Sequence, residues 1–389
     1  MKTTPVLLGD IADTCLGKML DQKKNKGEYQ PYLANVNVRW GGFDLDNLSQ
    51  MRFLETEEER YGLEYGDILL CEGGEPGRCA IWKNQIPHMK FQKALHRIRV
   101  HKGKVDYRWL YYRLLYAGFR KEFDQYFSGT TTIKHMPGDK LVRIRLNLPE
   151  LRVQEQIGDI LSVYDDLIEN NQKQIKLLEE AAQRLYKEWF VDLRFPGHED
   201  VQIVDGVPEG WKKERLVDIA DVQYGYAFDG SLFNSKKDGM PIVRIRNIPS
   251  GLTEDYTTED VDDQYIVHNG DIVVGMDGEF HINSWCGDDS YLVQRTCCMK
   301  PQKIEMKGWF LSAIYEPIKY FEKTVVGATV AHLGKKHIDT IQLLIGPDSY
   351  YVPFQKLFEK RQLLLNQNRM LREARDRLLP KLMSGEIEL

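Results

Sequence analysis

The chain contains nearly the same phrase twice, and this internal repeat limits its possible folds more than any other feature. LGDIADTCLG begins at Leu8, and LVDIADVQYG begins at Leu216. Three further stretches match in the same order: LEYGDILLCEGGEPG from Leu63 with IVHNGDIVVGMDGEF from Ile266, FQKALHRI from Phe91 with VQRTCCMK from Val293, and GTTTIKHMPGDKLVRIRLNLP from Gly129 with GATVAHLGKKHIDTIQLLIGP from Gly327. The sequence therefore predicts a duplicated domain of about 150 residues, a period too long for a solenoid.

Each copy has the pattern of a mixed α/β domain. Short β-branched runs alternate with Gly-rich turns, as in DILLCE from Asp67, IVRIRNI from Ile242, DIVVGM from Asp271 and TIQLLI from Thr340. One longer stretch, RWLYYRLLYAGFRKEF from Arg108, has helical spacing. These patterns predict an α+β fold class, without the order of the strands.

A different pattern follows each copy. From Gln154 to Phe190 apolar residues recur at heptad spacing, and from Pro353 a leucine recurs at every seventh position up to Pro380. At 1.5 Å per residue the first stretch makes a helix of about 55 Å. The residues that we expect in the seam between the two helices are Leu161, Ile168, Ile175, Leu178 and Leu185 in the first, and Leu357, Leu364, Leu371 and Leu378 in the second.

The two long helices have to bury their apolar stripes, and the economical solution is for them to pack on each other. If they run antiparallel, as a coiled coil, the two copies lie at opposite ends of a rod and are related by a pseudo-two-fold axis. Asn171 falls inside the seam. It either fixes the register of the pair or is a polar residue at one end of the interface.

Charge is distributed unevenly along the chain. The net charge is −5, but residues 1–150 hold 24 Lys and Arg against 19 Asp and Glu, whereas residues 197–347 hold 15 against 24. Residues 90–145 carry 14 basic and 4 acidic side chains. This segment is a candidate basic patch for a polyanion, and the alternative is an ordinary solvated surface.

The remaining composition favours a cytoplasmic protein. The six cysteines include no zinc-type spacing with histidines, and they suggest no disulfide framework. No stretch of about 18 uncharged apolar residues occurs, so we expect no membrane partner.

The order of repeat, long helix, repeat, long helix resembles the DNA specificity subunits of type I restriction-modification systems. The most specific marks are GDILLCEGGEPGRCAIW from Gly66, YGYAFDGSLF from Tyr224, GDIVVGMDGEF from Gly270, LLEEAAQRLYKEWFVDLRFPG from Leu177, and LREARDRLLPKLMSGEI from Leu371. The resemblance covers essentially the whole chain.

This resemblance implies an architecture and a set of partners. Residues 1–149 and 197–347 would be target recognition domains, and residues 150–196 and 348–389 the helices that separate them. Each domain would read one half of a gapped double-stranded DNA site, and the helices would receive two methyltransferase subunits. Restriction subunits are a further partner that the resemblance allows. The chain itself would bind no cofactor, because S-adenosylmethionine belongs to the methyltransferase subunit.

Several residue types are suited to contact with DNA. Phosphate oxygens accept hydrogen bonds from hydroxyls and cations, and guanine or adenine edges accept them from Arg, Lys, Gln and Asn. The candidates are Arg78, Gln92, Lys93, Thr130, Thr131, Lys134 and His135 in the first copy, and Arg244, Arg246, Asn247, Gln294, Arg295, Thr329, His332, Lys335 and Lys336 in the second. Gln92-Lys93 and Gln294-Arg295 place an amide beside a cation at matching positions. For all of them, ordinary surface or turn residues are the alternative.

No catalytic motif is present, since the chain has no P-loop, no G-x-S-x-G and no H-E-x-x-H. The alternative from another class is a self-sufficient magnesium-dependent nuclease that uses Asp67 and Glu72, or Asp271 and Asp277. A third is a coiled-coil scaffold without DNA. The spacing of Asp277, Glu279 and His281 also allows a metal, a cytosine contact or a plain turn.

Overall fold

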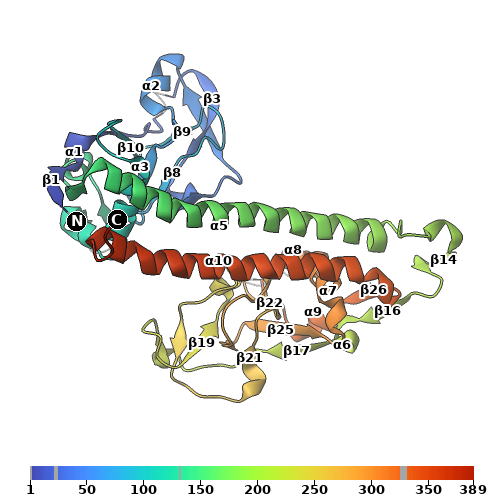
Figure 1. Ribbon diagram of the computed structural model, residues 1–389. Helices are drawn as coiled ribbons and strands as arrows, with labels where there is room; N and C mark the ends of the chain where they lie inside the picture. Colours follow the sequence, from blue (N-terminus) through green and yellow to red (C-terminus); the bar gives the residue numbers. More distant parts are fainter. Residues whose placement is uncertain (1, 22–24, 131–132, 325–330) are drawn as a thin grey trace. The chain divides into compact units, whose positions relative to one another are not determined.

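The computed structural model describes residues 2–21, 25–130, 133–324 and 331–389, and the chain divides into two compact units. Unit 1 comprises Met1–Leu167 and Leu371–Leu389, and unit 2 comprises Ile168–Met370. Each unit therefore contains one copy of the repeat together with part of both long helices. Both ends of the chain belong to unit 1 (Figure 1).

Unit 1 contains a four-stranded antiparallel sheet in the order β2-β10-β7-β8 and a three-stranded sheet in the order β6-β3-β9. The pairs β1-β13, β4-β5 and β11-β12 complete it. Its strands are β1 (Thr3–Leu7), β2 (Ala12–Leu16), β3 (Glu28–Leu33), β4 (Val38–Arg39), β5 (Gly42–Phe43), β6 (Ser49–Phe53), β7 (Ile68–Cys71), β8 (Cys79–Ile81), β9 (Lys90–Phe91), β10 (Leu95–Val100), β11 (Ser128–Thr130), β12 (Ile133–His135) and β13 (Arg145–Pro149). Its short helices are α1 (Leu8–Ile11), α2 (Glu58–Tyr61), α3 (Tyr107–Phe119) and α4 (Gly138–Leu141).

The larger of the hydrophobic clusters in unit 1 packs the four-stranded sheet against α3. The carboxylate of Asp106 begins α3 by accepting hydrogen bonds from the backbone N–H groups of Arg108 and Trp109. Trp109 and Leu110 are then buried with the strand β7, all of whose residues are buried. The expected helix from Arg108 and the expected strand at DILLCE are both confirmed.

Unit 2 contains a four-stranded sheet in the order β17-β25-β22-β23 and a five-stranded sheet in the order β18-β20-β19-β24-β21. Its strands are β14 (Ile203–Val204), β15 (Val207–Pro208), β16 (Lys212–Arg215), β17 (Ala220–Tyr224), β18 (Phe233–Asn234), β19 (Met240–Val243), β20 (Tyr256–Thr257), β21 (Ile266–Val267), β22 (Ile272–Gly275), β23 (Ile282–Ser284), β24 (Ser290–Leu292), β25 (Thr296–Pro301) and β26 (Gln342–Ile345). Its short helices are α6 (Leu216–Ile219), α7 (Lys307–Ala313), α8 (Tyr315–Thr324) and α9 (Lys335–Ile338).

The repeated phrase forms the same local structure in both units. In each case it gives one short helical turn and the strand that pairs with β10 or β25. The phrase ends in Gly17 or Gly225, where a Cβ would lie 2.3 Å from the Gln92 carbonyl oxygen or 2.1 Å from that of Val293. Only glycine permits this approach of two backbones.

The strand pairing corrects one detail of the repeat. Leu16 pairs with His96 in unit 1, and its counterpart Tyr224 pairs with Cys297 in unit 2. His96 therefore corresponds to Cys297, and counting back along both strands places Ala94 at the position of Arg295. Gln92 and Lys93 thus correspond to Val293 and Gln294. The prediction of an amide and a cation at matching positions is wrong by one residue.

The long helices are α5 (Leu151–Tyr186), followed by a π-helical turn (Lys187–Val191), and α10 (Val352–Ser384). In unit 1 the early residues of α5 are buried with the late residues of α10, as Leu161 is with Leu382. In unit 2 the amide nitrogen of Asn171 donates to the amide oxygen of Asn368 at 3.0 Å. Within each unit the two helices therefore run antiparallel.

The expected seam is confirmed better in α5 than in α10. Leu161, Ile168, Ile175 and Leu364 are buried, whereas the other five expected residues, Leu178, Leu185, Leu357, Leu371 and Leu378, are half-buried. A row of residues seven apart faces inward instead, and its three middle members are polar. Its residues are Phe354, Arg361, Asn368, Arg375 and Leu382.

Pro380 does not end the second helix, although the leucine repeat stops just before it. It lies inside α10, which continues to Ser384. The neighbouring Leu379 and Leu382 are buried in the core of unit 1, and this packing stabilises the last turn although proline removes one backbone hydrogen bond.

Arg361 of α10 links this helix to α5 and β23 within unit 2. Its guanidinium donates to Glu179 on α5 at 2.7 Å, and to Ser284 and Asn283 of β23 at 2.6 Å each. Only 8% of the residue is exposed. Charge-assisted bonds in such a place are strong, and their removal leaves polar groups without partners.

We expect Arg361→Met to lower the free energy of unfolding by about 2–4 kcal/mol, because its partners lose their donor in a buried place. Urea unfolding followed by circular dichroism measures this effect. Arg377→Met is the matched control on the same helix, since the Arg377 side chain is 82% exposed. Equal midpoints for the two variants would contradict the structural role of Arg361.

Candidate nucleic-acid interface

In each unit the loop after the buried strand β7 or β22 meets the segment that contains a candidate histidine. Gly73 bridges to His135 in unit 1, and Asp277 bridges to His332 in unit 2. The two histidines therefore hold equivalent positions. Their neighbours Met136 and Leu333 donate backbone hydrogen bonds to the carbonyls of Glu72 and Met276, which shows the same register in both units.

Each of these histidines contacts a carboxylate. The Nδ1 atom of His135 lies 3.2 Å from Glu72, and that of His332 lies 2.5 Å from Asp277. The two carboxylates come from adjacent, non-equivalent positions, because Asp277 corresponds to Gly73. All four residues are candidates from the sequence. Their pairing could not be predicted, because it depends on tertiary contacts that bring the two segments together.

The candidate turns present exposed cations. Lys93 lies in the turn before β10, where the side chain of its neighbour Gln92 accepts a hydrogen bond from the backbone of Ala94. Arg295 lies in the turn before β25, beside the exposed Gln294. Lys335 and Lys336 are exposed at the start of α9. No described carboxylate forms an ion pair with either of these lysines or with Lys93.

Other candidates have internal partners. The Arg78 guanidinium donates to Glu75 and to the Asn35 carbonyl, each at 2.8 Å. Lys134 lies 3.8 Å from Asp124.

The sequence VRIRNI is only partly a strand, since Ile245–Asn247 forms a 3-10 turn after β19. Asn247 is 9% exposed, and its side-chain oxygen accepts the Arg244 backbone N–H, so it holds this turn together. Arg246 is paired with Asp255, and Arg244 lies over the Phe233 ring.

Only one of the three candidate threonines lies within the described residues. Thr130 belongs to β11, whereas Thr131 and Thr329 lie outside the described residues.

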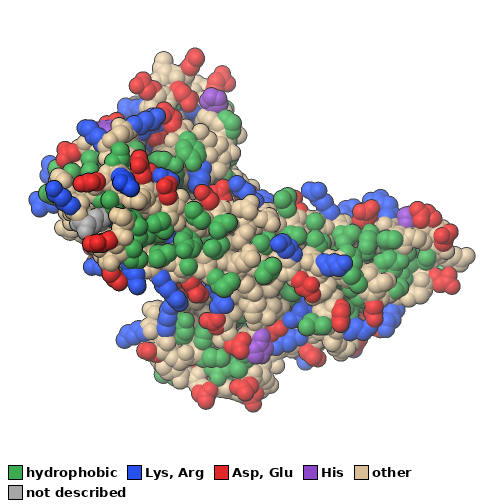
Figure 2. Space-filling model, viewed as in Figure 1, with side chains coloured by type: hydrophobic (Ala, Val, Ile, Leu, Met, Phe, Trp, Pro, Cys, Tyr) green, Lys and Arg blue, Asp and Glu red, His purple; other side chains and the backbone are tan. Residues whose placement is uncertain are grey.

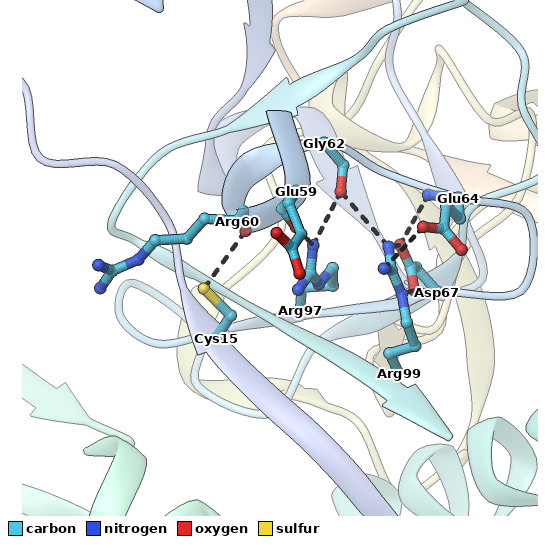
Figure 3. A network of polar contacts seen from close by, with 8 residues as sticks. All are labelled: Cys15, Glu59, Arg60, Gly62, Glu64, Asp67, Arg97 and Arg99. Carbon is cyan, nitrogen blue, oxygen red and sulfur yellow. Dashed lines mark hydrogen bonds and ion pairs between the residues drawn. The ribbon is translucent and has the colours of Figure 1, made fainter. Parts of the chain in front are cut away.

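Much of the charge in the predicted basic segment is neutralised internally. Arg99 donates to Asp67 at 2.7 Å and to Glu64 at 2.8 Å, while Arg97 donates to the Gly62 carbonyl at 2.9 Å (Figure 3). Arg108 and Arg113 are likewise paired with acidic residues. Basic and acidic side chains are interspersed over the face seen in Figure 2. These contacts therefore neutralise part of the charge of the segment.

The acidic residues proposed for a nuclease are largely occupied. Asp67 closes a turn by accepting the Glu64 backbone N–H and binds Arg99, and Asp271 does the same with His268 and Lys300. Within the described part of the chain, no three His, Cys, Asp or Glu side chains gather so as to hold a metal ion. The structure gives the nuclease no support.

His96 anchors the segment of unit 1 that contains His135. It is 1% exposed, and its Nε2 lies 2.7 Å from the Met136 carbonyl oxygen, next to His135. Burial lowers the pKa of His96 below the usual value of 6.5, although this hydrogen bond and the charge of Glu72 oppose the shift. The equivalent residue in unit 2 is Cys297.

These features define a class of protein: two copies of one α/β domain whose equivalent loops carry different side chains, combined with two long helices. The family model of the type I restriction modification DNA specificity domain matches residues 2–180 and 208–350. The chain belongs to this family, whose members are the non-catalytic specificity subunits of type I restriction-modification systems.

Individual relatives agree with this assignment. The chain is 27% identical over 347 residues to the type I restriction enzyme MjaIX specificity subunit of Methanocaldococcus jannaschii. The matched residues cover 83% of this chain and 78% of that protein. It is 30% identical over 142 residues to the EcoBI specificity subunit of Escherichia coli, covering 36% and 30%.

A solved structure shows the same fold. The type I restriction-modification S subunit from M. genitalium aligns with a TM-score of 0.54 at 16% identity, covering 98% of this chain and 99% of that one. None of the helices in the described ranges is long and apolar enough to cross a membrane.

We expect acid to destabilise unit 1 through His96. Because its folded-state pKa is lowered, the unfolded chain takes up the proton first. Above about pH 6.5 His96 does not reduce the free energy of unfolding. Below that pH the free energy of unfolding falls as the pH drops toward the folded-state pKa, by up to about 1.4 kcal/mol per pH unit. Thermal unfolding at several pH values measures this slope.

His96→Cys, which introduces the residue found at the equivalent position of unit 2, is the matched control. It should remove the His96 part of the slope below about pH 6.5. An unchanged slope in this variant would assign the acid sensitivity to other groups.

Proposed function

We propose that this specificity subunit reads a gapped, two-part site in double-stranded DNA, one part with each repeat, and that its long helices bind two methyltransferase subunits. In this proposal residues 1–149 and 197–347 are the two readers, and residues 150–196 and 348–389 are the antiparallel spacer. S-adenosylmethionine is bound by the methyltransferase, not by this chain. Restriction subunits are a further partner that this assembly allows.

The observation that carries the proposal is the pair of matched loops. Both units place a histidine at the same position of the fold and next to a carboxylate. The carboxylates come from adjacent positions, and other residues around the histidine also differ, as Ala94 differs from Arg295. A shared frame with different side chains is what two readers of different sequences require.

The long helices carry exposed apolar side chains that suit a protein partner. Val163 and Leu167 are 57% and 45% exposed and lie one turn apart on α5. Leu363 and Met370 are 50% and 57% exposed and lie two turns apart on α10. Apolar side chains are visible among the charged ones over these helices (Figure 2). Contact with a methyltransferase subunit would remove them from water.

Replacing residues 197–347 by the matching segment of a relative should change one half of the methylated site. The other half and the gap should stay as they are, since well-separated contacts contribute additively. Genome-wide methylation mapping in cells that also contain the methyltransferase measures the outcome. A swap that changes both halves would contradict independent reading.

Lys335 and Lys336 should contribute to the binding affinity for every DNA sequence to the same extent. Lys335→Gln combined with Lys336→Gln should weaken binding uniformly and reduce the salt dependence by about one unit of slope for each phosphate that is no longer neutralised. Binding of the methyltransferase complex at several salt concentrations measures it. Lys212→Gln with Lys303→Gln is the control, because these two lysines are paired with Glu214 and Asp348.

A further inference from the structure

Arg295 occupies a strained and exposed position in the second repeat. It lies in the turn between β24 and β25 with a φ of 70°, in the left-handed region that residues other than glycine rarely adopt. Its side chain is nevertheless 56% exposed. The structure therefore holds an unfavourable backbone conformation at a residue whose side chain points mostly into solvent.

Asp277 and His332 flank the guanidinium. The Nε atom lies 3.4 Å from a carboxylate oxygen of Asp277, and the Nη1 atom lies 3.4 Å from Nδ1 of His332. The same Nδ1 lies 2.5 Å from the second oxygen of Asp277, a contact in which the ring nitrogen carries the proton and donates it to the carboxylate. His332 therefore orients Asp277 and does not accept a hydrogen bond from Arg295. Among the described residues nothing accepts a hydrogen bond from Nη2, so Nη2 and the outer proton of Nη1 can donate side by side to a ligand.

The first repeat provides an internal comparison. Glu72 and Met276 donate their backbone N–H groups to the carbonyls of Ala94 and Arg295, which confirms that these two residues are equivalent. Asp277 corresponds to Gly73 through the bridges to the two histidines. The arginine and its carboxylate are thus present together in one repeat and absent together from the other, whereas the histidine is common to both.

A role in stability alone accounts poorly for these observations. An exposed ion pair contributes little to folding, and it gives no reason for a left-handed arginine. The same repeat contains a plain exposed pair, Arg215 with Asp218, whose arginine side chain is also 56% exposed. Arg215 lies in a regular strand and has a negative φ.

We propose that Arg295 reads a guanine in the half-site of the second repeat, with Asp277 and His332 as its positioning residues. Two parallel N–H donors match the O6 and N7 acceptors of guanine in the major groove. Fixing the guanidinium before binding keeps the donors aligned and reduces the entropy cost of binding. The proposal rests on the proposed function, because it requires the second repeat to face DNA bases.

The test combines protein variants with base-pair substitutions. The complex of the full chain with its methyltransferase subunits is bound to its mapped site and to duplexes that each carry one substituted base pair. For the wild type, one G·C pair of a single half-site should show a loss of affinity of about 10- to 100-fold on substitution. For Arg295→Ala this loss should shrink to less than about threefold at that pair and stay unchanged elsewhere.

Two further variants complete the design. Arg215→Ala, the matched exposed pair, should keep the wild-type profile at every base pair. Asp277→Asn retains Arg295 but weakens its positioning, so it should reduce discrimination at the same G·C pair by a smaller factor. Circular dichroism of all variants confirms that they are folded.

Equal weakening of Arg295→Ala on every duplex would show a phosphate contact and overturn the proposal. An unchanged profile would show an ion pair with no role in reading, and it would overturn the proposal as well. If the wild-type complex binds no gapped site at all, the proposed function fails, and this result differs from the other two because it needs no variant.

Discussion

The packing of both long helices into the core of each repeat is the interaction on which the rest of the structure depends. In unit 1, Leu161 of α5 and Leu382 of α10 are fully or almost fully buried with the sheet and α3. In unit 2, Phe354 of α10 and Phe190 after α5 are buried with Trp309 of α7. Burial of such side chains contributes about 1.5–3 kcal/mol each. The helices are therefore part of each domain and not a linker added to it.

Patterns that repeat along the chain predicted most of the architecture. The duplicated phrase, the buried strands and the two long helices all follow from local periodicity, which depends only on which side chains avoid water. Asn171 was also placed correctly in the seam, because a polar residue in an apolar row is visible in the sequence. Its partner, Asn368, was not foreseen, since a hydrogen-bonded pair needs two helices in a known register.

The parts that sequence reasoning missed are set by tertiary contacts. The inward row of α10 contains Arg361 and Arg375, which a hydrophobic pattern assigns to the surface. They are tolerated inside because Glu179 and Asp165 lie opposite them within their units. The one-residue shift between Gln92 and Gln294 was hidden for a related reason. In the sequence, the similar residues of the two turns suggest one alignment. The true register is fixed by strand pairing, which involves residues far away in the chain.

The exposed apolar residues of the long helices also affect how prone the protein is to self-association in a cell. Side chains such as Leu363 and Met370 would be covered only while a partner is bound. A chain produced in excess of its partners would keep this surface in water, where it favours self-association and aggregation. If methyltransferase subunits cover this surface as proposed, production of the subunits in matched amounts keeps it out of water, a need separate from that of the DNA chemistry.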